Sequence, residues 1–336
     1  MAASILVTGA SGFIGSFIVQ EALKRKFGVW AGVRPTSSRD YLQARKIHFL
    51  ELDFAHPNEL RAQLSGHKGT YSKFDYIVHC AGLTKTTNKS DFDKVNFLQT
   101  KYFIETLKEL NMVPKQFIFL SSLSVFGPIH EKDYTSIREY DIPNPNTLYG
   151  ISKLKAELYI QSLAGFPYVI YRPTGVYGPR DKDYYLMAKS IKNHFDFSVG
   201  YKQQDITFIY VKDLVDAIFA GIEKDVVRRA YFVAEENVYQ SSSFSELIRK
   251  ELGNPFVFHI KAPLFVLKII SLLAETASRL TGKSSTLNAD KYNILKQRNW
   301  RCDTSPIEKE LGFKPTYSLA EGVKETIAWY KEQGWL

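Results

Sequence analysis

The sequence has little cysteine and no long apolar run. Only two of its 336 residues are cysteine, Cys80 and Cys302, which is too few for a disulfide framework or a cysteine-based zinc site. The most apolar segment, residues 262–274, is interrupted by Lys268 and Ser271 and is shorter than the roughly 20 residues that a membrane-spanning helix needs. The first residues carry no basic and apolar leader. We therefore expect a cytoplasmic protein without a secretory signal.

Histidine and charge are also distributed without a functional pattern. The seven histidines lack ligand spacings such as HExxH, so no metal site is predicted. The net charge of +9 is spread over both halves, and the 20 Tyr and 23 Phe are not interleaved with a basic run. No nucleic-acid partner is therefore expected. A content of 45% hydrophobic and 24% charged residues excludes collagen-like and wholly disordered chains.

Short apolar strands and helical segments alternate over the first half of the chain. Strands are predicted at residues 5–7, 29–33, 47–52, 76–80, 117–120 and 168–171. Helices are predicted from residue 13, briefly after residue 33, from about Pro57, and at 92–110 and 149–163. Such alternation predicts an α/β fold with a doubly wound parallel sheet covered on both faces. The second half is less regular, with a helix at 213–222, a strand at 230–233 and mostly helix thereafter.

A glycine-rich turn follows the first strand and opens the first helix. Its glycines have the spacing G-x-x-G-x-x-G and permit a tight turn, close backbone approach to a pyrophosphate and close helix packing. The helix N-terminus adds unpaired N–H groups and a positive dipole end. A bound dinucleotide is therefore predicted, with contacts from Gly9, Ser11, Gly12, Phe13, Ile14 and Gly15.

The ends of the next two strands should lie beside the adenosine. Arg34 stands where an acidic residue would accept from a ribose hydroxyl, and a guanidinium there suits a 2′-phosphate. This favours NADP(H), with Arg39 in the same loop as a second contact. The alternative is that Arg34 stacks on adenine and NAD binds. Asp53, followed by Phe54, could accept from the adenine amino group or cap the helix after Pro57.

Tyr149 and Lys153 lie four residues apart, on one face of a predicted helix. A phenol has a pKa near 10, and a neighbouring ammonium would lower it. Such a tyrosine can exchange a proton with a substrate hydroxyl while hydride passes to or from a nicotinamide. Ser122 follows the strand at 117–120, where ligands bind in such sheets, and could hydrogen-bond the reacting oxygen. The alternative for these serines is to satisfy loop backbone.

These motifs together resemble the extended short-chain dehydrogenases/reductases of the NAD-dependent epimerase/dehydratase superfamily. The matching segments are residues 8–15, 79–82, 95–96, 121–127, 149–153, 172–180 and 208–213. The resemblance implies a Rossmann-type domain at 1–171 and a smaller, mostly helical substrate-binding region at 172–336, from which residues 205–235 return to the first domain.

The resemblance also assigns residues. It makes Ser122, Tyr149 and Lys153 catalytic, with Tyr149 and Lys153 also touching the cofactor, and Asn96 a structural residue near the site. It places Cys80, Ala81 and Gly82 near the ribose and pyrophosphate, and Pro173, Thr174 and Val176 against the nicotinamide. Helices 92–110 and 149–163 are expected to form a homodimer. Cys80, at the end of a buried strand, is not expected to be a nucleophile.

Two departures help to choose a subclass. Leu123 and Ser124 stand where sugar-nucleotide 4,6-dehydratases carry Asp-Glu, and Thr174 stands where many nucleotide-sugar epimerases carry Asn. They favour a hydroxysteroid-dehydrogenase- or dihydroflavonol-reductase-like oxidoreductase acting on an alcohol or ketone of a small or lipophilic substrate. A nucleotide-sugar epimerase and a non-enzymatic NAD(P)-binding sensor remain the alternatives.

Residues 261–301 concentrate the positive charge, with eight basic residues against Glu275 and Asp290, next to the apolar run at 263–273. Three interpretations are open for this run. The preferred interpretation is a helix packed against the rest of the protein. The alternatives are a lid over a lipophilic substrate and an interfacial helix that makes weak contact with a membrane surface.

Overall fold

The computed structural model describes residues 2–281 and 288–336, and the chain forms two compact units. The first contains Met1–Ser122, Leu148–Arg172 and Val215–Tyr231, and the second contains Leu123–Thr147, Pro173–Leu214 and Phe232–Leu336. Residues 123–147, which the predicted boundary assigns to the first domain, lie in the second unit. The segment that returns to the first unit is Val215–Tyr231. Part of the basic segment 261–301 falls at 282–287 and lies outside the described residues.

A seven-stranded sheet in the order β10-β6-β5-β4-β1-β2-β3 forms the first unit's centre. Every pairing from β3 to β6 is parallel. The order reverses between β1 and β4, the switch point at which ligands bind in such sheets. The prediction of a doubly wound α/β fold is confirmed. The strands are β1 (Ser4–Thr8), β2 (Gly28–Val33), β3 (Ile47–Glu51), β4 (Tyr76–His79), β5 (Gln116–Leu120), β6 (Tyr168–Pro173) and β10 (Arg229–Val233).

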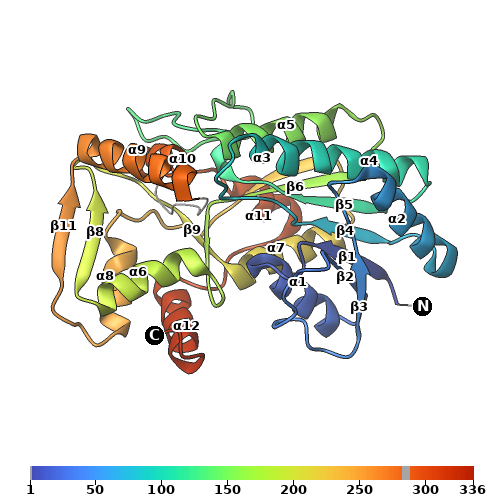
Figure 1. The fold of residues 1–336 in the computed structure, drawn as a ribbon, viewed down its shortest axis with the longest axis horizontal. Coiled ribbons are helices and arrows are strands. Elements are labelled where there is room, and N and C mark those ends of the chain that lie inside the picture. Colours follow the sequence, from blue (N-terminus) through green and yellow to red (C-terminus); the bar gives the residue numbers. More distant parts are fainter. Residues whose placement is uncertain (1, 282–287) are drawn as a thin grey trace. The chain divides into compact units, whose positions relative to one another are not determined.

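Helices cover both faces of this sheet, as Figure 1 shows, with α4 and α5 on one face and α1 on the other. Since both faces are covered, the central strands are mostly apolar, and all five residues of β5 are buried. The helices of this unit are α1 (Phe13–Lys24), α2 (Pro57–Tyr71), α3 (Ser90–Phe92), the π-helical turn η1 (Asp93–Leu98), α4 (Gln99–Glu109) and α5 (Leu148–Ser162); α7 (Val211–Glu223) begins in the second unit.

The second unit is mostly helical and carries two small parallel sheets, β7 with β9 and β8 with β11. Its core is rich in tyrosine and phenylalanine, such as Tyr177 and Phe244, whose ring centroids lie 5.2 Å apart. Its elements are η2 (Leu123–Val125), β7 (Gly175–Tyr177), α6 (Lys182–Lys192), β8 (Phe195–Val199), β9 (Phe208–Tyr210), α8 (Ser243–Glu251), β11 (Phe258–Ala262), α9 (Leu264–Thr281), α10 (Ala289–Lys296), α11 (Ser305–Leu311) and α12 (Leu319–Glu332).

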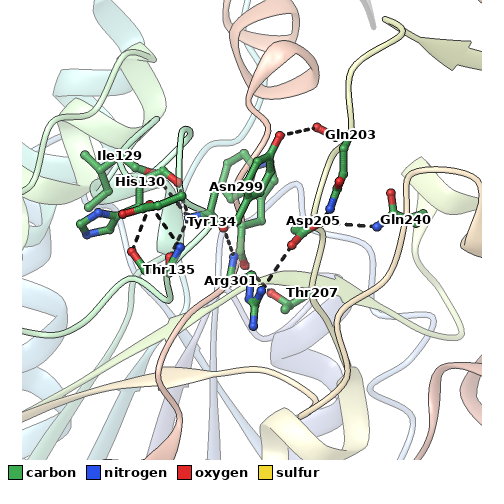
Figure 2. A network of polar contacts seen from close by, with 12 residues as sticks. Ile129, His130, Tyr134, Thr135, Gln203, Asp205, Thr207, Gln240, Asn299 and Arg301 are labelled. Carbon is green, nitrogen blue, oxygen red and sulfur yellow. Dashed lines mark hydrogen bonds and ion pairs between the residues drawn. The ribbon is translucent and has the colours of Figure 1, made fainter.

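A polar network joins three distant segments of the second unit (Figure 2). The fully buried Asn299 donates to the Thr135 carbonyl at 2.9 Å. Asp205 accepts from Gln203 at 2.8 Å and lies 3.5 Å from the Arg301 guanidinium. The residues around Asn299 are thereby tied to the loop near Thr135 and to the chain that leads into β9.

Three secondary-structure predictions are wrong. No helix follows β2, because residues 34–46 form turns, the first closed by a 3.0 Å bond from the Ser37 N–H to the Arg34 carbonyl. The helix predicted at 92–110 is interrupted by the π-helical turn η1. Residues 258–262, in the stretch predicted to be mostly helix, form a strand, because they pair in parallel with Phe195–Val199. Within the described residues, no helix is both long and apolar enough to cross a membrane.

Candidate active site

The glycine-rich turn is closely packed against the loop after β4. Gly9 has a φ of +65°, and a Cβ there would lie 2.8 Å from the Ala81 nitrogen. A Cβ on Gly15 would lie 2.2 Å from the Gly9 carbonyl oxygen, so α1 packs against the turn only with glycine at this position. Gly12 is the N-cap of α1 and no side chain caps the helix. The uncapped N–H groups and the dipole of α1 suit an anionic pyrophosphate.

Ser11, Phe13 and Ile14 lie half-buried around this turn, while Gly12 is exposed. The loop Cys80–Gly82 follows β4, beside the turn: the Cys80 N–H donates to the Thr8 carbonyl at 3.3 Å. A Cβ on Gly82 would lie 3.2 Å from the Lys153 nitrogen. The structure therefore brings the phosphate turn, the loop Cys80–Gly82 and Lys153 together within the first unit.

His79 fixes this loop from below. It is buried, and its ring nitrogens lie 2.8 Å from the Thr8 hydroxyl and 3.1 Å from the Thr100 hydroxyl. The Thr100 hydroxyl donates to the Asn96 carbonyl, so it accepts from Nε2 of His79, and Nδ1 accepts from Thr8. Burial lowers the pKa of His79 to about 3, which keeps the ring neutral in this role. Burial also raises the pKa of Cys80 to about 12, as an unreactive thiol requires.

Lys153 is a buried cation at the end of β5. Its ammonium donates to the Leu120 carbonyl at 2.9 Å and lies 4.7 Å from the centre of the Phe119 ring. Burial lowers the pKa of Lys153 to about 8, and the Glu157 carboxylate opposes part of that shift. A lysine at this depth retains N–H groups that can donate to a ribose hydroxyl.

Tyr149 lies one turn before Lys153 on α5, and its hydroxyl hydrogen-bonds the Ser122 side chain. Burial raises the pKa of Tyr149 to about 12, and the hydrogen bond with Ser122 offsets only part of this rise. The expectation that the pKa of Tyr149 lies below that of a free phenol is wrong for the structure, because burial of the phenol dominates. Tyr149 is therefore protonated at neutral pH.

Asn96, in the π-helical turn, holds the site from the side. Its amide accepts from the Leu83 N–H at 2.7 Å and donates to the Leu83 carbonyl at 3.0 Å. It also donates to the Ser152 hydroxyl at 3.0 Å, and Ser152 in turn donates to the Tyr149 carbonyl at 2.8 Å. One fully buried amide thus connects the loop after β4 to the helix that carries Tyr149.

An ion pair anchors the same helix from its next turn. Glu157 receives two bonds from Arg172 at the end of β6, at 3.0 Å from Nε and 2.7 Å from Nη2. The Glu157 side chain is 1% exposed and the Arg172 side chain is 7% exposed. A buried bidentate pair of this kind fixes α5 over the sheet, because breaking it would leave an unpaired charge in the core.

The residues predicted to contact the adenosine differ in whether their side chains are already engaged in the protein. Arg34 is exposed at the end of β2, whereas Arg39 lies 4.4 Å from the Phe49 ring centre and 3.9 Å from Glu51. Asp53 accepts from the Ala55 N–H at 3.0 Å and lies 2.8 Å from His56, so both of its oxygens serve the turn before α2. Phe54 packs edge-on against Phe103 of the core, with ring centroids 5.2 Å apart.

The residues predicted for the nicotinamide belong to the second unit. Pro173 ends β6, the Thr174 N–H donates to the Val233 carbonyl at 3.1 Å, and Val176 pairs with Ile209 between β7 and β9. The Thr174 hydroxyl is buried. Ser122, Tyr149 and Lys153 all lie in the first unit.

Three contributors were not predicted from the sequence: Phe119 beside Lys153, the Leu120 carbonyl that accepts a hydrogen bond from Lys153, and Ser152. Phe119 and Leu120 read as ordinary strand core. Ser152 was visible only as a position inside the Tyr-x-x-x-Lys motif, and its neighbour Asn96 lies far away in the sequence. Among the described residues, no group of three or more His, Cys, Asp or Glu is placed to hold a metal ion.

Comparison with known proteins gives the family. The model of the family described as NAD dependent epimerase/dehydratase matches residues 5–234. An uncharacterized UDP-glucose epimerase of Bacillus subtilis (strain 168) is 28% identical, over 97% of this chain and 97% of its own. The decarboxylating sterol-4-alpha-carboxylate 3-dehydrogenase of Saccharomyces cerevisiae is 23% identical, over 98% of each chain.

Solved structures agree at the level of the fold. The dTDP-glucose 4,6-dehydratase of Bacillus anthracis str. Ames in complex with NAD superposes with a TM-score of 0.77 at 18% identity. The match covers 98% of this chain and 97% of that one. Relatives with different reactions thus share one architecture over essentially the whole length.

Proposed function

Because the chain belongs to the NAD dependent epimerase/dehydratase family, as an extended short-chain dehydrogenase/reductase, we propose that it transfers hydride between a nicotinamide and an alcohol or ketone carbon. The proposal rests on one observation: the Tyr149 hydroxyl, buried and hydrogen-bonded to Ser122, lies on the same helix face as Lys153. The relatives with named activities are enzymes, which supports an enzyme over a non-enzymatic cofactor sensor.

The proton chemistry follows from the two shifted pKa values. With its pKa near 12, Tyr149 is protonated at neutral pH and can donate to the oxygen of a ketone as that oxygen gains negative charge. Ser122 orients the same oxygen. Lys153 holds the ribose, and a bound nicotinamide dinucleotide would supply or accept the hydride.

We propose a small or lipophilic substrate rather than a sugar nucleotide. Leu123 and Ser124 lack the acid and base that elimination of water requires. A relative named as a sterol-4-alpha-carboxylate 3-dehydrogenase supports a lipophilic substrate. The alternative is a nucleotide-sugar epimerase, which the Bacillus subtilis relative favours.

We propose NADP(H) as the cofactor, because the exposed Arg34 at the end of β2 is available to a 2′-phosphate. NAD is the alternative, supported by the NAD complex of the Bacillus anthracis relative. The carried-over contacts of Pro173, Thr174 and Val176 with the nicotinamide belong to this proposal.

We further propose a cytoplasmic homodimer that uses the helices at 92–110 and 149–163. Two apolar side chains of α5 support it, since Ile151 is 36% exposed and Leu158 is 56% exposed. A Leu158→Lys variant should then elute as a monomer in size-exclusion chromatography with light scattering, while the unchanged chain elutes as a dimer.

The test of the reaction uses the purified chain with NADPH or NADH and a panel of lipophilic ketones and alcohols. We expect turnover that Tyr149→Phe reduces by at least about 10³-fold, with cofactor binding retained. Full turnover by Tyr149→Phe would refute the mechanism. Protection against thermal unfolding by UDP- or dTDP-sugars, together with no turnover on the panel, would favour the epimerase alternative.

A further inference from the structure

The two-stranded sheet of β8 and β11 turns its apolar face away from the protein. The parallel register pairs Phe195 with Phe258 and Phe197 with Ile260. Because side chains alternate along a strand, these four lie on one face. They are 43%, 55%, 61% and 41% exposed, in the order Phe195, Phe258, Phe197 and Ile260. A sheet covered on one side normally places its apolar residues inward.

The opposite face of this sheet carries its polar residues and packs against the rest of the unit. The Asp196 side chain is 13% exposed and accepts from the Ser245 hydroxyl of α8 at 3.2 Å. His259, its register partner, lies 3.1 Å from the same carboxylate oxygen. Asp196 is thus satisfied on this side of the sheet, while the His259 side chain remains 59% exposed. The exposed apolar face has no partner among the described residues.

Helix α9 also exposes a stripe of apolar side chains. Phe265, Ile269, Leu272 and Leu273 stand at i, i+4, i+7 and i+8 and are 67%, 54%, 52% and 66% exposed. The buried side of the helix includes Ser271, at 1% exposure. The interpretation of this run as a packed helix is therefore wrong for its most apolar stripe.

These two surfaces adjoin. β11 ends at Ala262 and α9 begins at Leu264, as Figure 1 shows at the junction of the two elements. Leu264 lies within 3.7 Å of the position that a Cβ on Gly200, just after β8, would occupy. The exposed apolar residues of β8, β11 and α9 form what we call the apolar face.

The segment that contains β11 and most of α9 carries only positive charge. The chain has no acidic residue between Glu251 and Glu275, and Lys261 and Lys268 in that interval are both exposed. The Lys261 ammonium lies 5.1 Å from the centre of the Tyr201 ring, itself 68% exposed. Phenylalanine and leucine flanked by exposed lysine are typical of surfaces that lie in the interface of an anionic membrane.

We propose that the second unit docks on a bilayer containing anionic phospholipid. Phe197, Phe258, Phe265 and Leu273 enter the boundary between headgroups and acyl chains. Lys268 of α9 contacts the phosphates, and Lys261, on the opposite face of β11, adds positive charge near the membrane surface. The lysines decide for this occupant over an apolar protein surface, because a second copy of the chain would oppose like charges. The proposal goes beyond the proposed reaction and does not depend on it.

Co-sedimentation of the full-length chain with vesicles tests the proposal without any activity assay. We expect binding to vesicles of phosphatidylcholine mixed with phosphatidylserine, weaker binding to phosphatidylcholine alone, and loss of binding as salt is raised. Absence of binding to the mixed vesicles at low salt would overturn the proposal.

Variants locate the binding surface. The double variant Phe265→Ser, Leu273→Ser should bind vesicles at least about tenfold more weakly, because it loses two apolar side chains that the bilayer would bury. Ile142→Ser, which removes a residue 85% exposed elsewhere in the same unit, should leave it unchanged. Lys261→Gln and Lys268→Gln should each cost about fivefold, and the exposed Lys324→Gln nothing. Thermal unfolding confirms that each variant is folded.

Two further outcomes would refute the proposal. Equal losses in the test and control variants would mean that binding is non-specific. A dimer in light scattering that the Phe265→Ser, Leu273→Ser variant dissociates, without vesicle binding by either protein, would assign the apolar face to a second copy of the chain.

Discussion

The central sheet and the small sheet of β8 and β11 use apolar residues in opposite ways. β5, Gln-Phe-Ile-Phe-Leu, is buried along its whole length, whereas β8, Phe-Asp-Phe-Ser-Val, buries its aspartate and exposes its phenylalanines. A continuous apolar run requires cover on both faces. An alternating run requires cover on one face only and does not say which face that is. The difference separates strands that build the fold from strands that present a surface.

The same contrast applies to polar groups. In the central sheet they gather at the carboxyl ends of strands, as with Thr8, Ser121 and Ser122, where a ligand is expected. In the small sheet they serve the interior, as Asp196 does. Polarity therefore marks the reactive edge in one sheet and the packed face in the other.

Truncation of one phenylalanine in each sheet should give the largest contrast. Phe119→Ala removes a fully buried ring beside Lys153 and should lower the free energy of unfolding by about 3–5 kcal/mol. Phe197→Ala removes a ring that is 61% exposed and should change it by less than about 0.5 kcal/mol. Urea unfolding of both variants measures the difference, and equal losses would contradict the contrast.

Loss of the buried ion pair should have the next largest effect. Glu157→Gln leaves Arg172 buried without its carboxylate and should destabilise the protein by about 3 kcal/mol. The exposed pair Arg61 and Glu109 provides the control, because Glu109→Gln should cost less than about 1 kcal/mol. Glu157→Gln should also lower the pKa of Lys153 below about 8, since the carboxylate raises it. A stability equal to that of the control variant would contradict this.

Removal of the serine hydroxyl should affect the reaction rather than the stability. Ser122→Ala should lower kcat/KM by about 10²-fold, as loss of a donor to a reacting oxygen does. The Ser122 bond lowers the pKa of Tyr149, so its loss raises that pKa above about 12. Oxidation needs the phenolate, and its rate should therefore rise only at higher pH than in the unchanged enzyme. An unchanged pH–rate profile would contradict the effect of Ser122 on the pKa of Tyr149.

The smallest effect concerns the cofactor. Arg34→Ala should weaken NADPH binding about tenfold, or about 1.4 kcal/mol, and leave NADH binding unchanged. Fluorescence titration with each dinucleotide measures both constants. NADH binding at least about tenfold tighter than NADPH binding by the unchanged chain would overturn the choice of NADP(H).

Most of the fold could be predicted because the central strands are short apolar runs and the helices between them are periodic. The motif residues Gly9, Tyr149 and Lys153 were recognisable because each needs a local spacing. The pKa of Tyr149 was not predictable, since it depends on burial by segments distant in sequence. The exposure of the apolar face was not predictable either. Alternation shows that apolar side chains share one face of a strand, but not whether that face is packed or exposed.

The π-helical turn η1 has a consequence for how this chain tolerates change. A π turn holds more residues than an α turn, so the segments before and after it are out of phase by one residue. Deleting a single residue between Asp93 and Leu98 would restore a regular helix and change which side chains of this turn face α5 and the loop after β4. Asn96 would then lose its hold on Leu83 and Ser152 while helicity is retained. A more regular helix at this point would therefore disrupt the contacts that hold the helix carrying Tyr149.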